Sequence, residues 1–177
     1  MTMSYKGWKS LFLFCLGLFA GTAICMKWLE SEFVVNGRVF TIIGLEITYP
    51  KEQVAAIFQG LEEPARSLLR FQLLFDFAFM AGVYPGIAAL CMMAVHKTRK
   101  PLFRQLLLAL AALQGLAWAC DNIENVFLLK WLRSPGTISD FGFYHMVVWV
   151  KWILALGAAL IAIPSALRRN RIAVHKV

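Results

Sequence analysis

The sequence predicts an all-α membrane protein, a bundle of four transmembrane helices with a small cap on the extracytoplasmic side. Of the 177 residues, 60% are apolar and only 16% are charged, and the mean hydropathy is +0.66. Soluble globular domains average about 45–50% apolar and about 25% charged residues. The chain has room for four spans of about 20 residues and one modest loop, and this excludes a large soluble catalytic domain.

Four long apolar runs are the expected spans of a single membrane domain covering residues 1–177. They cover about residues 8–29, 68–95, 106–132 and 144–167. The first run follows two lysines, as the core of a signal peptide would. It is too long for such a core and ends in Met26-Lys27-Trp28 rather than in small residues, so we interpret it as a retained helix.

Charge is distributed unevenly among the connecting segments. Ten basic residues and no acidic residue lie in the two terminal segments and the middle connection: Lys6, Lys9, Lys97, Arg99, Lys100, Arg104, Arg168, Arg169, Arg171 and Lys176. This positive-inside pattern predicts cytoplasmic termini in a plasma membrane, most simply a bacterial inner membrane. The net charge of +8 then reports topology, and we expect the lipid bilayer as a partner and no nucleic acid.

Residues 30–67, between the first two spans, are expected to form the cap. Asn36-Gly37 lies between two β-favouring runs and predicts a hairpin, whose second strand should continue through residues 41–43. Pro50 suits the start of a short helix, and Pro64 suits the start of the next helix, which should run unbroken into the second span.

Four ionisable side chains lie inside the expected spans, where such groups are costly and are functional hypotheses by default. They are Asp76, Asp121, Glu124 and Lys151. At 1.5 Å per residue, each lies roughly 10–17 Å below the outer end of its helix, so three helices bring charge to one depth. Three acids cannot all ionise cheaply beside one lysine in a low dielectric. Either some stay protonated, or a cation or cationic ligand joins them.

A polar stripe on the third span extends this group. Asp121, Glu124 and Asn125 share one helix face, and Gln114 and Trp118 continue it toward the cytoplasm. In the second span, Pro85 is expected to kink the helix. The expected ligand-binding residues are Asp76, Tyr84, Gln114, Trp118, Asp121, Glu124, Asn125 and Lys151.

Other chemistries lack support in the sequence. His96 and His175 lie in cytoplasmic basic segments and His145 at the entrance of the fourth span, so no metal site, haem or other cofactor is expected. The four cysteines form no C-x-x-C pair and are interpreted as packing residues. Gly17-x-x-x-Gly21 and Gly82-x-x-x-Gly86 are expected to let helices of this chain approach closely, with dimerisation as the alternative.

Four short motifs are spread over about 80 residues: Tyr49-Pro50-Lys51-Glu52, the Asp76 region, Tyr84-Pro85 and Asp121-x-x-Glu124-Asn125. Together they resemble a pattern in an uncharacterised family of small four-helix bacterial membrane proteins with an Asp-x-x-Glu-Asn motif in the third span. The resemblance implies four spans and a functional or structural importance of the Asp121-x-x-Glu124-Asn125 stripe. It implies no activity. In architecture alone, the chain is also similar to four-helix sterol isomerases and sigma-receptor-like proteins, which place acids in a lipid-accessible cavity.

Three classes of function remain open. The first is a binding protein or accessory subunit that holds a lipid-like ligand or docks onto a larger membrane complex or a second copy. The second is an intramembrane enzyme or carrier for a lipid-like or isoprenoid substrate, with Asp121 or Glu124 as general acid or base and Lys151 stabilising charge. An ion-coupled transporter is the third, disfavoured because the chain has no internal repeat. For a bound ligand or substrate, the cluster should line a narrow cavity beside Gly82, Pro85 and Gly86, with an acidic upper wall and an apolar floor. A solidly packed cluster would instead favour the accessory subunit.

Overall fold

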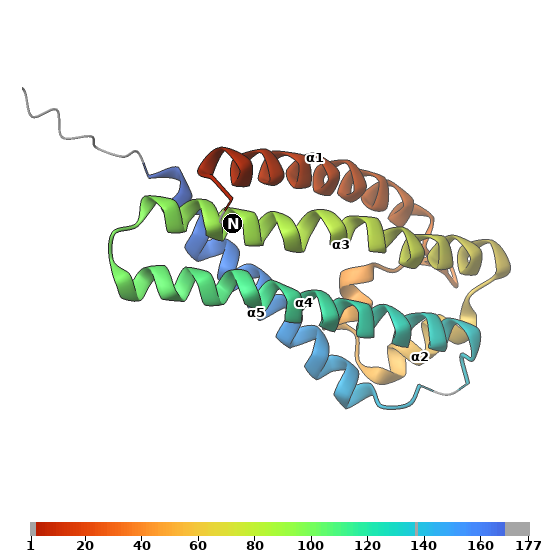
Figure 1. The fold of residues 1–177 in the computed structure, drawn as a ribbon. Helices are drawn as coiled ribbons and strands as arrows, with labels where there is room; N and C mark the ends of the chain where they lie inside the picture. Colours follow the sequence, from red (N-terminus) through yellow and green to blue (C-terminus); the bar gives the residue numbers. More distant parts are fainter. Residues whose placement is uncertain (1–2, 137, 169–177) are drawn as a thin grey trace, which may run out of the picture.

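The computed structural model describes residues 3–136 and 138–168. Four long helices dominate it: α1 (Tyr5–Leu29), α3 (Glu63–Lys97), α4 (Pro101–Arg133) and α5 (Phe141–Leu167) (Figure 1). Each is long and apolar enough to cross a membrane. The prediction of an all-α protein with four long apolar helices is therefore confirmed, and the helices extend a few residues beyond the apolar runs.

The centre of the bundle is α3, which packs against α1, α4 and α5, while α4 and α5 also pack against each other. In contrast, α1 makes its extensive contacts with α3, and it lies along that helix in Figure 1. Only 11% of the apolar segment of α1 is buried, against 56% for α3. The bundle is therefore a three-helix core with a fourth helix added on one side, and a seam separates α1 from α5.

The contact between α1 and α3 depends on Gly82. A Cβ atom at this position would lie 2.7 Å from the backbone nitrogen of Phe19 and 3.0 Å from the carbonyl oxygen of Cys15, so only glycine allows so close an approach. Gly17 and Gly21 of α1 have no neighbouring atom within 4 Å of such a Cβ. The expected packing role within the chain is therefore wrong for that pair.

The segment between α1 and α3, residues 30–62, forms the cap. Its hairpin pairs β1 (Val34–Val35) with β2 (Arg38–Val39). Asn36 and Gly37 occupy the turn with φ values of 51° and 73°, as the sequence predicts. A single-turn 3₁₀ helix, η1 (Glu30–Glu32), precedes the hairpin, and α2 (Lys51–Gly60) follows it.

The expected continuation of the second strand through residues 41–43 is wrong. The chain turns there into a short π-helical segment, η2 (Gly44–Thr48). The side chain of Thr41 accepts a hydrogen bond from the Gly44 amide at 2.9 Å, and Glu30 Oε1 accepts one from the Ile42 amide at 3.0 Å. Because side chains satisfy these backbone donors, the segment needs no strand partner and can coil.

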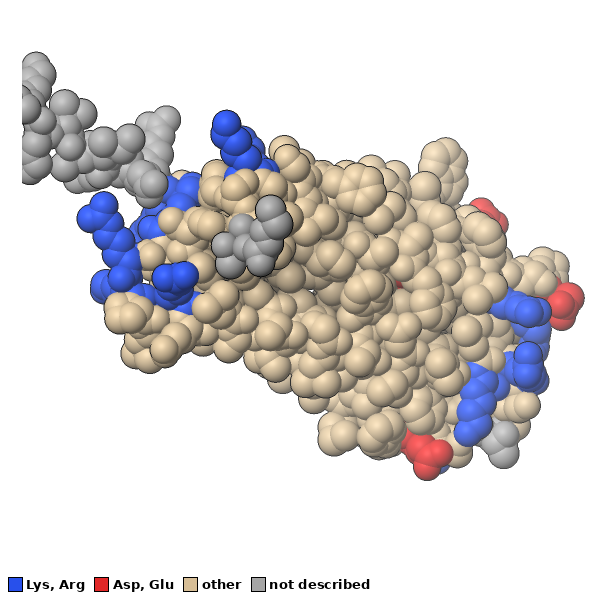
Figure 2. Space-filling model, in the orientation of Figure 1, with Lys and Arg blue, Asp and Glu red and all other residues tan. Residues whose placement is uncertain are grey.

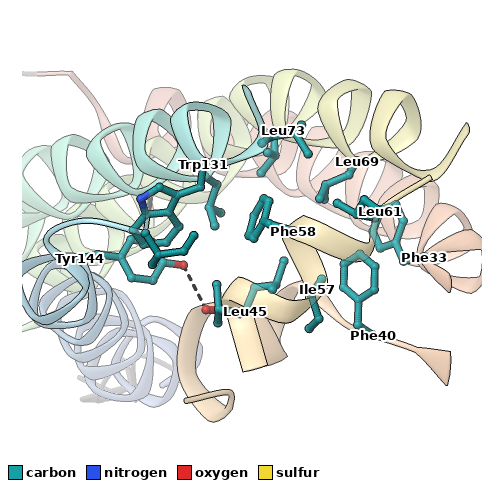
Figure 3. Close-up of a cluster of buried hydrophobic side chains, with 14 of the residues drawn as sticks. Phe33, Phe40, Leu45, Ile57, Phe58, Leu61, Leu69, Leu73, Trp131 and Tyr144 are labelled. Atoms are coloured by element: carbon teal, nitrogen blue, oxygen red, sulfur yellow. Dashed lines mark hydrogen bonds between the residues drawn. The ribbon is translucent and has the colours of Figure 1, made fainter. Parts of the chain in front are cut away.

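A buried apolar cluster fixes the cap on the end of the three-helix core (Figure 3). From the helices, the cluster contains Leu69 and Leu73 of α3, Trp131 of α4 and Tyr144 of α5. The cap packs against them with six side chains: Phe33, Phe40, Leu45, Ile57, Phe58 and Leu61. The Tyr144 hydroxyl also donates a hydrogen bond to the Leu45 carbonyl oxygen at 3.2 Å. These contacts hold η2 against α5, and this placement determines the site described next.

Candidate functional site: a buried charge cluster beside an apolar groove

Lys151 of α5 is the centre of a buried charge cluster. Its Nζ atom lies 3.2 Å from Glu46 Oε2, 3.1 Å from Asp121 Oδ1 and 2.6 Å from Glu124 Oε2. All four residues are at most 8% exposed. Lys151 donates hydrogen bonds to Glu46 and Asp121 and forms an ion pair with Glu124, so three carboxylates surround its ammonium group.

Glu46 is the member of the cluster that the sequence analysis missed. It comes from η2 in the cap and reaches into the outer end of the bundle, where Trp152 Nε1 donates a hydrogen bond to Glu46 Oε2 at 3.0 Å. The sequence contains one weak signal for this position. Glu46 lies between the apolar residues Leu45 and Ile47, which is more typical of a buried segment than of an exposed loop. The cap therefore contributes to the site directly.

Two further hydrogen bonds lie beside this cluster. The Tyr84 hydroxyl donates to Asp121 Oδ2 at 2.6 Å. Asn125 Nδ2 donates to Asp76 Oδ2 at 2.7 Å. In the part of the chain that the structure describes, Asp76 forms no ion pair with Lys151. The four ionisable residues noted in the sequence thus come together, with Asp76 at the margin of the group.

Gln114 and Trp118 lie away from this group. Gln114 Nε2 donates hydrogen bonds to the carbonyl oxygens of Leu110 and Leu154, at 3.2 and 3.3 Å, and so ties α4 to α5. Trp118 is 37% exposed and stacks on the Tyr84 ring with centroids 6.4 Å apart. Gln114 and Trp118 therefore make packing contacts between helices, although the sequence places them on the same face of α4 as the acids.

A groove runs along the seam between α1 and α5, with α3 as its floor. It encloses about 630 Å³, within the range of roughly 300–1,000 Å³ typical of ligand pockets. Most of its lining is apolar and comes from α1, α3 and α5. At one end, under the cap, it is lined by Glu46, Gln72, Asp76, Asp121 and Lys151. Four of the expected ligand-binding residues do not line the groove: Glu124, Asn125, Gln114 and Trp118.

The carboxylates are not arranged as a metal centre. Among residues 3–136 and 138–168, no group of three or more His, Cys, Asp or Glu side chains is placed to hold a metal ion. What the arrangement offers is a long apolar surface that ends in a polar, hydrogen-bonding wall.

Fold and site together define a class: an all-α protein with four helices long and apolar enough to span a membrane, and a buried charge cluster at the end of a lateral groove. No family model, curated protein or solved structure matches the chain. The resemblance to small four-helix bacterial membrane proteins therefore rests on its motif residues.

Proposed function

We propose that this chain is an integral membrane protein that binds a lipid-like amphiphile in the groove between α1 and α5. The observation that carries the proposal is the groove itself, which is apolar along most of its length and polar at one end. A ligand with an apolar chain and a polar head group has the same distribution of polarity.

The surface supports insertion in a membrane. A broad band almost free of charged side chains separates the two ends of the molecule on the face shown in Figure 2. Large apolar side chains are exposed along the helices, among them Phe14, Ile24, Ile153 and Leu160. An apolar surface of this extent is typical of contact with lipid or a partner protein.

The proposed orientation in the membrane is based on the distribution of basic residues. The start of α1, the connection between α3 and α4 and the end of α5 lie at one end of the bundle, opposite the cap (Figure 1). On the face shown in Figure 2, that end carries Lys and Arg without acidic side chains. Residues 169–177, with three of the ten basic residues, lie outside the described part of the chain. By the positive-inside rule we propose that this end lies in the cytoplasm, with a bacterial inner membrane as the simplest setting.

Cysteine labelling in intact cells tests this orientation. In a background with the native cysteines replaced, a cysteine at Asn36 should react with an impermeant maleimide and a cysteine at Thr98 should not. The opposite pattern would invert the topology.

The geometry of the groove suits entry from the bilayer. Its lining on α5 runs from Lys151 to Ile163, and twelve residues at 1.5 Å per residue span about 18 Å. Because α1 is packed mainly on α3, the seam opens sideways. In this proposal the head group lies under the cap and the chain extends toward the opposite end, in contact with lipid tails.

Catalysis has less support than binding. Glu124 does not line the groove, so as a general acid or base it would not reach a bound ligand. Lys151 has three carboxylates around its ammonium group, so its charge is already matched by acids of the protein. Of the three candidate catalytic residues, Asp121 alone combines a groove-facing position with an acidic group.

A variant that fills the groove tests the binding proposal. Ala159 lines the groove, and Ala159→Phe should displace an apolar chain. Ala119 lies on an exposed face of α4, so Ala119→Phe is the matched control. After purification in a mild detergent, mass spectrometry of extracted lipid should detect a co-purifying amphiphile with the unmodified and Ala119→Phe proteins, and little with Ala159→Phe. Equal lipid content in all three would overturn the proposal.

A further inference from the structure

We infer that the groove selects an amphiphile with a protonated, phosphate-free amine as its head group. The inference rests on the proposed function and specifies the chemistry of the ligand. It comes from the juxtaposition of four carboxyl groups, one fully surrounded lysine and one unpartnered buried amide at the closed end of an apolar groove.

Charge balance is the first argument. Three acids line this end of the groove, Glu46, Asp76 and Asp121, and a fourth, Glu124, contacts Lys151 without lining the groove. They face one cation, Lys151. Lys27 and Glu30 also line the groove, but they form an ion pair with each other and add no net charge. Buried carboxylates without a partner are costly, so a second cation in the groove would stabilise the ionised cluster.

Hydrogen-bonding capacity is the second argument. Three donors at this end are already used: Trp152 donates to Glu46, Tyr84 to Asp121 and Asn125 to Asp76. Acceptors remain. In the part of the chain that the structure describes, Glu46 Oε1 and Asp76 Oδ1 accept no hydrogen bond. A head group that brings N–H donors therefore matches the site, whereas a carboxylate or phosphate would add further acceptors.

Gln72 gives an independent indication of a missing ligand. It lines the groove and is 3% exposed, so its amide is buried. Its Oε1 atom has no hydrogen-bond partner among the described residues. A buried amide oxygen without a partner is rare and calls for an explanation. Gln72 precedes Asp76 by one helical turn on α3, so both side chains lie on the same face. One ammonium group can bond to both.

An organic cation fits better than a metal ion. No group of metal-ligating side chains is assembled among the described residues, and about 18 Å of apolar wall on α5 would have no role in holding a bare ion. The same wall would bury the chain of an alkyl amine and so add apolar contact to the ionic recognition.

Binding of three single-chain probes with the same tail tests the inference. Dodecylamine, dodecanol and dodecanoate are titrated into the purified protein in maltoside micelles, with affinity measured by isothermal calorimetry. The Ala159→Phe protein corrects for partition into the micelle. Dodecylamine should bind at least about tenfold more tightly than the other two, which corresponds to about 1.4 kcal/mol. Equal affinities, or a preference for dodecanoate, would overturn the inference.

Two variants locate the selectivity. Asp76→Asn keeps an oxygen for Asn125 and removes the charge, so it should abolish the preference for dodecylamine over dodecanol. Asp140→Asn is the control, because Asp140 is exposed, lies outside the groove and has a positive φ of 56° that asparagine tolerates. Its preference should be unchanged. A preference that persists in Asp76→Asn would overturn the assignment of the head-group position.

The outcomes separate the two proposals. If all three probes bind equally and Ala159→Phe blocks them, lipid binding stands and amine selectivity fails. If no probe binds and no lipid co-purifies, both fail. A lysophospholipid with an ethanolamine head group carries an ammonium next to a phosphate. Tighter binding of that lipid than of dodecylamine would overturn the assignment to a phosphate-free amine.

Discussion

Replacing Lys151 with methionine removes the cation at the centre of the buried cluster. The side chain volume is nearly kept, but Glu46, Asp121 and Glu124 lose a partner that lies within 3.2 Å of each. Removing one partner of a buried ion pair costs about 3–5 kcal/mol. At roughly 2–4 °C per kcal/mol for a chain of this size, the melting temperature should fall by about 6–20 °C.

Thermal unfolding in detergent, followed by tryptophan fluorescence, measures this shift. Lys130→Met is the matched control, because Lys130 is exposed on α4 and its substitution should change the melting temperature by only about 1–2 °C. The double variant Lys151→Met/Glu124→Gln removes one of the carboxylates left without a cation and should recover part of the loss. A Lys151→Met protein as stable as the Lys130→Met protein, or a double variant less stable than the single one, would refute the ion-pair reasoning.

Four further substitutions test the packing by the same melting assay. Gly82→Ala should destabilise the protein by about 1–3 kcal/mol through overpacking, because the new Cβ would lie 2.7 Å from the α1 backbone. A Cβ atom at Gly157 would have no neighbouring atom within 4 Å, so Gly157→Ala should instead stabilise α5 by about 0.5–1 kcal/mol. Equal changes in stability for the two glycine variants would contradict the close crossing of α1 and α3. Tyr144→Phe should cost about 1–3 kcal/mol because it leaves the Leu45 carbonyl without its donor. Phe58→Ala should cost about 3–5 kcal/mol, since Phe58 is fully buried in the cap, and a loss below 1 kcal/mol would show that the cap is not docked as described.

Local sequence patterns predicted much of the fold. The four apolar runs locate the long helices because span length and composition are properties of each segment alone. Asn36-Gly37 predicts the hairpin for the same reason, since both residues must accept positive φ. The depth of Asp121, Glu124 and Lys151 followed from counting residues along their helices, and the structure brings these side chains into contact.

The missed features all depend on how segments pack together. Glu46 joins the cluster because η2 coils instead of extending, and this depends on side-chain caps from Glu30 and Thr41. The Gly82-x-x-x-Gly86 pattern indicates a close crossing on α3, but nothing in the sequence identifies α1 as the helix that crosses there. The sequence predicted a cavity beside Gly82, Pro85 and Gly86 of the second span. Gly82 and Gly86 do line the groove, whereas its walls on α1 and α5 were not predicted.

The hydrogen bond from Ile42 to Glu30 has a mechanical consequence. Glu30 caps the end of α1, one wall of the groove, and Ile42 lies one helical turn before Glu46. The same carboxylate that ends this wall therefore anchors the backbone that carries Glu46 to Lys151. Substitution of Glu30 would remove a support of the buried cluster, although in the described part of the chain Glu30 itself forms no ion pair with Lys151.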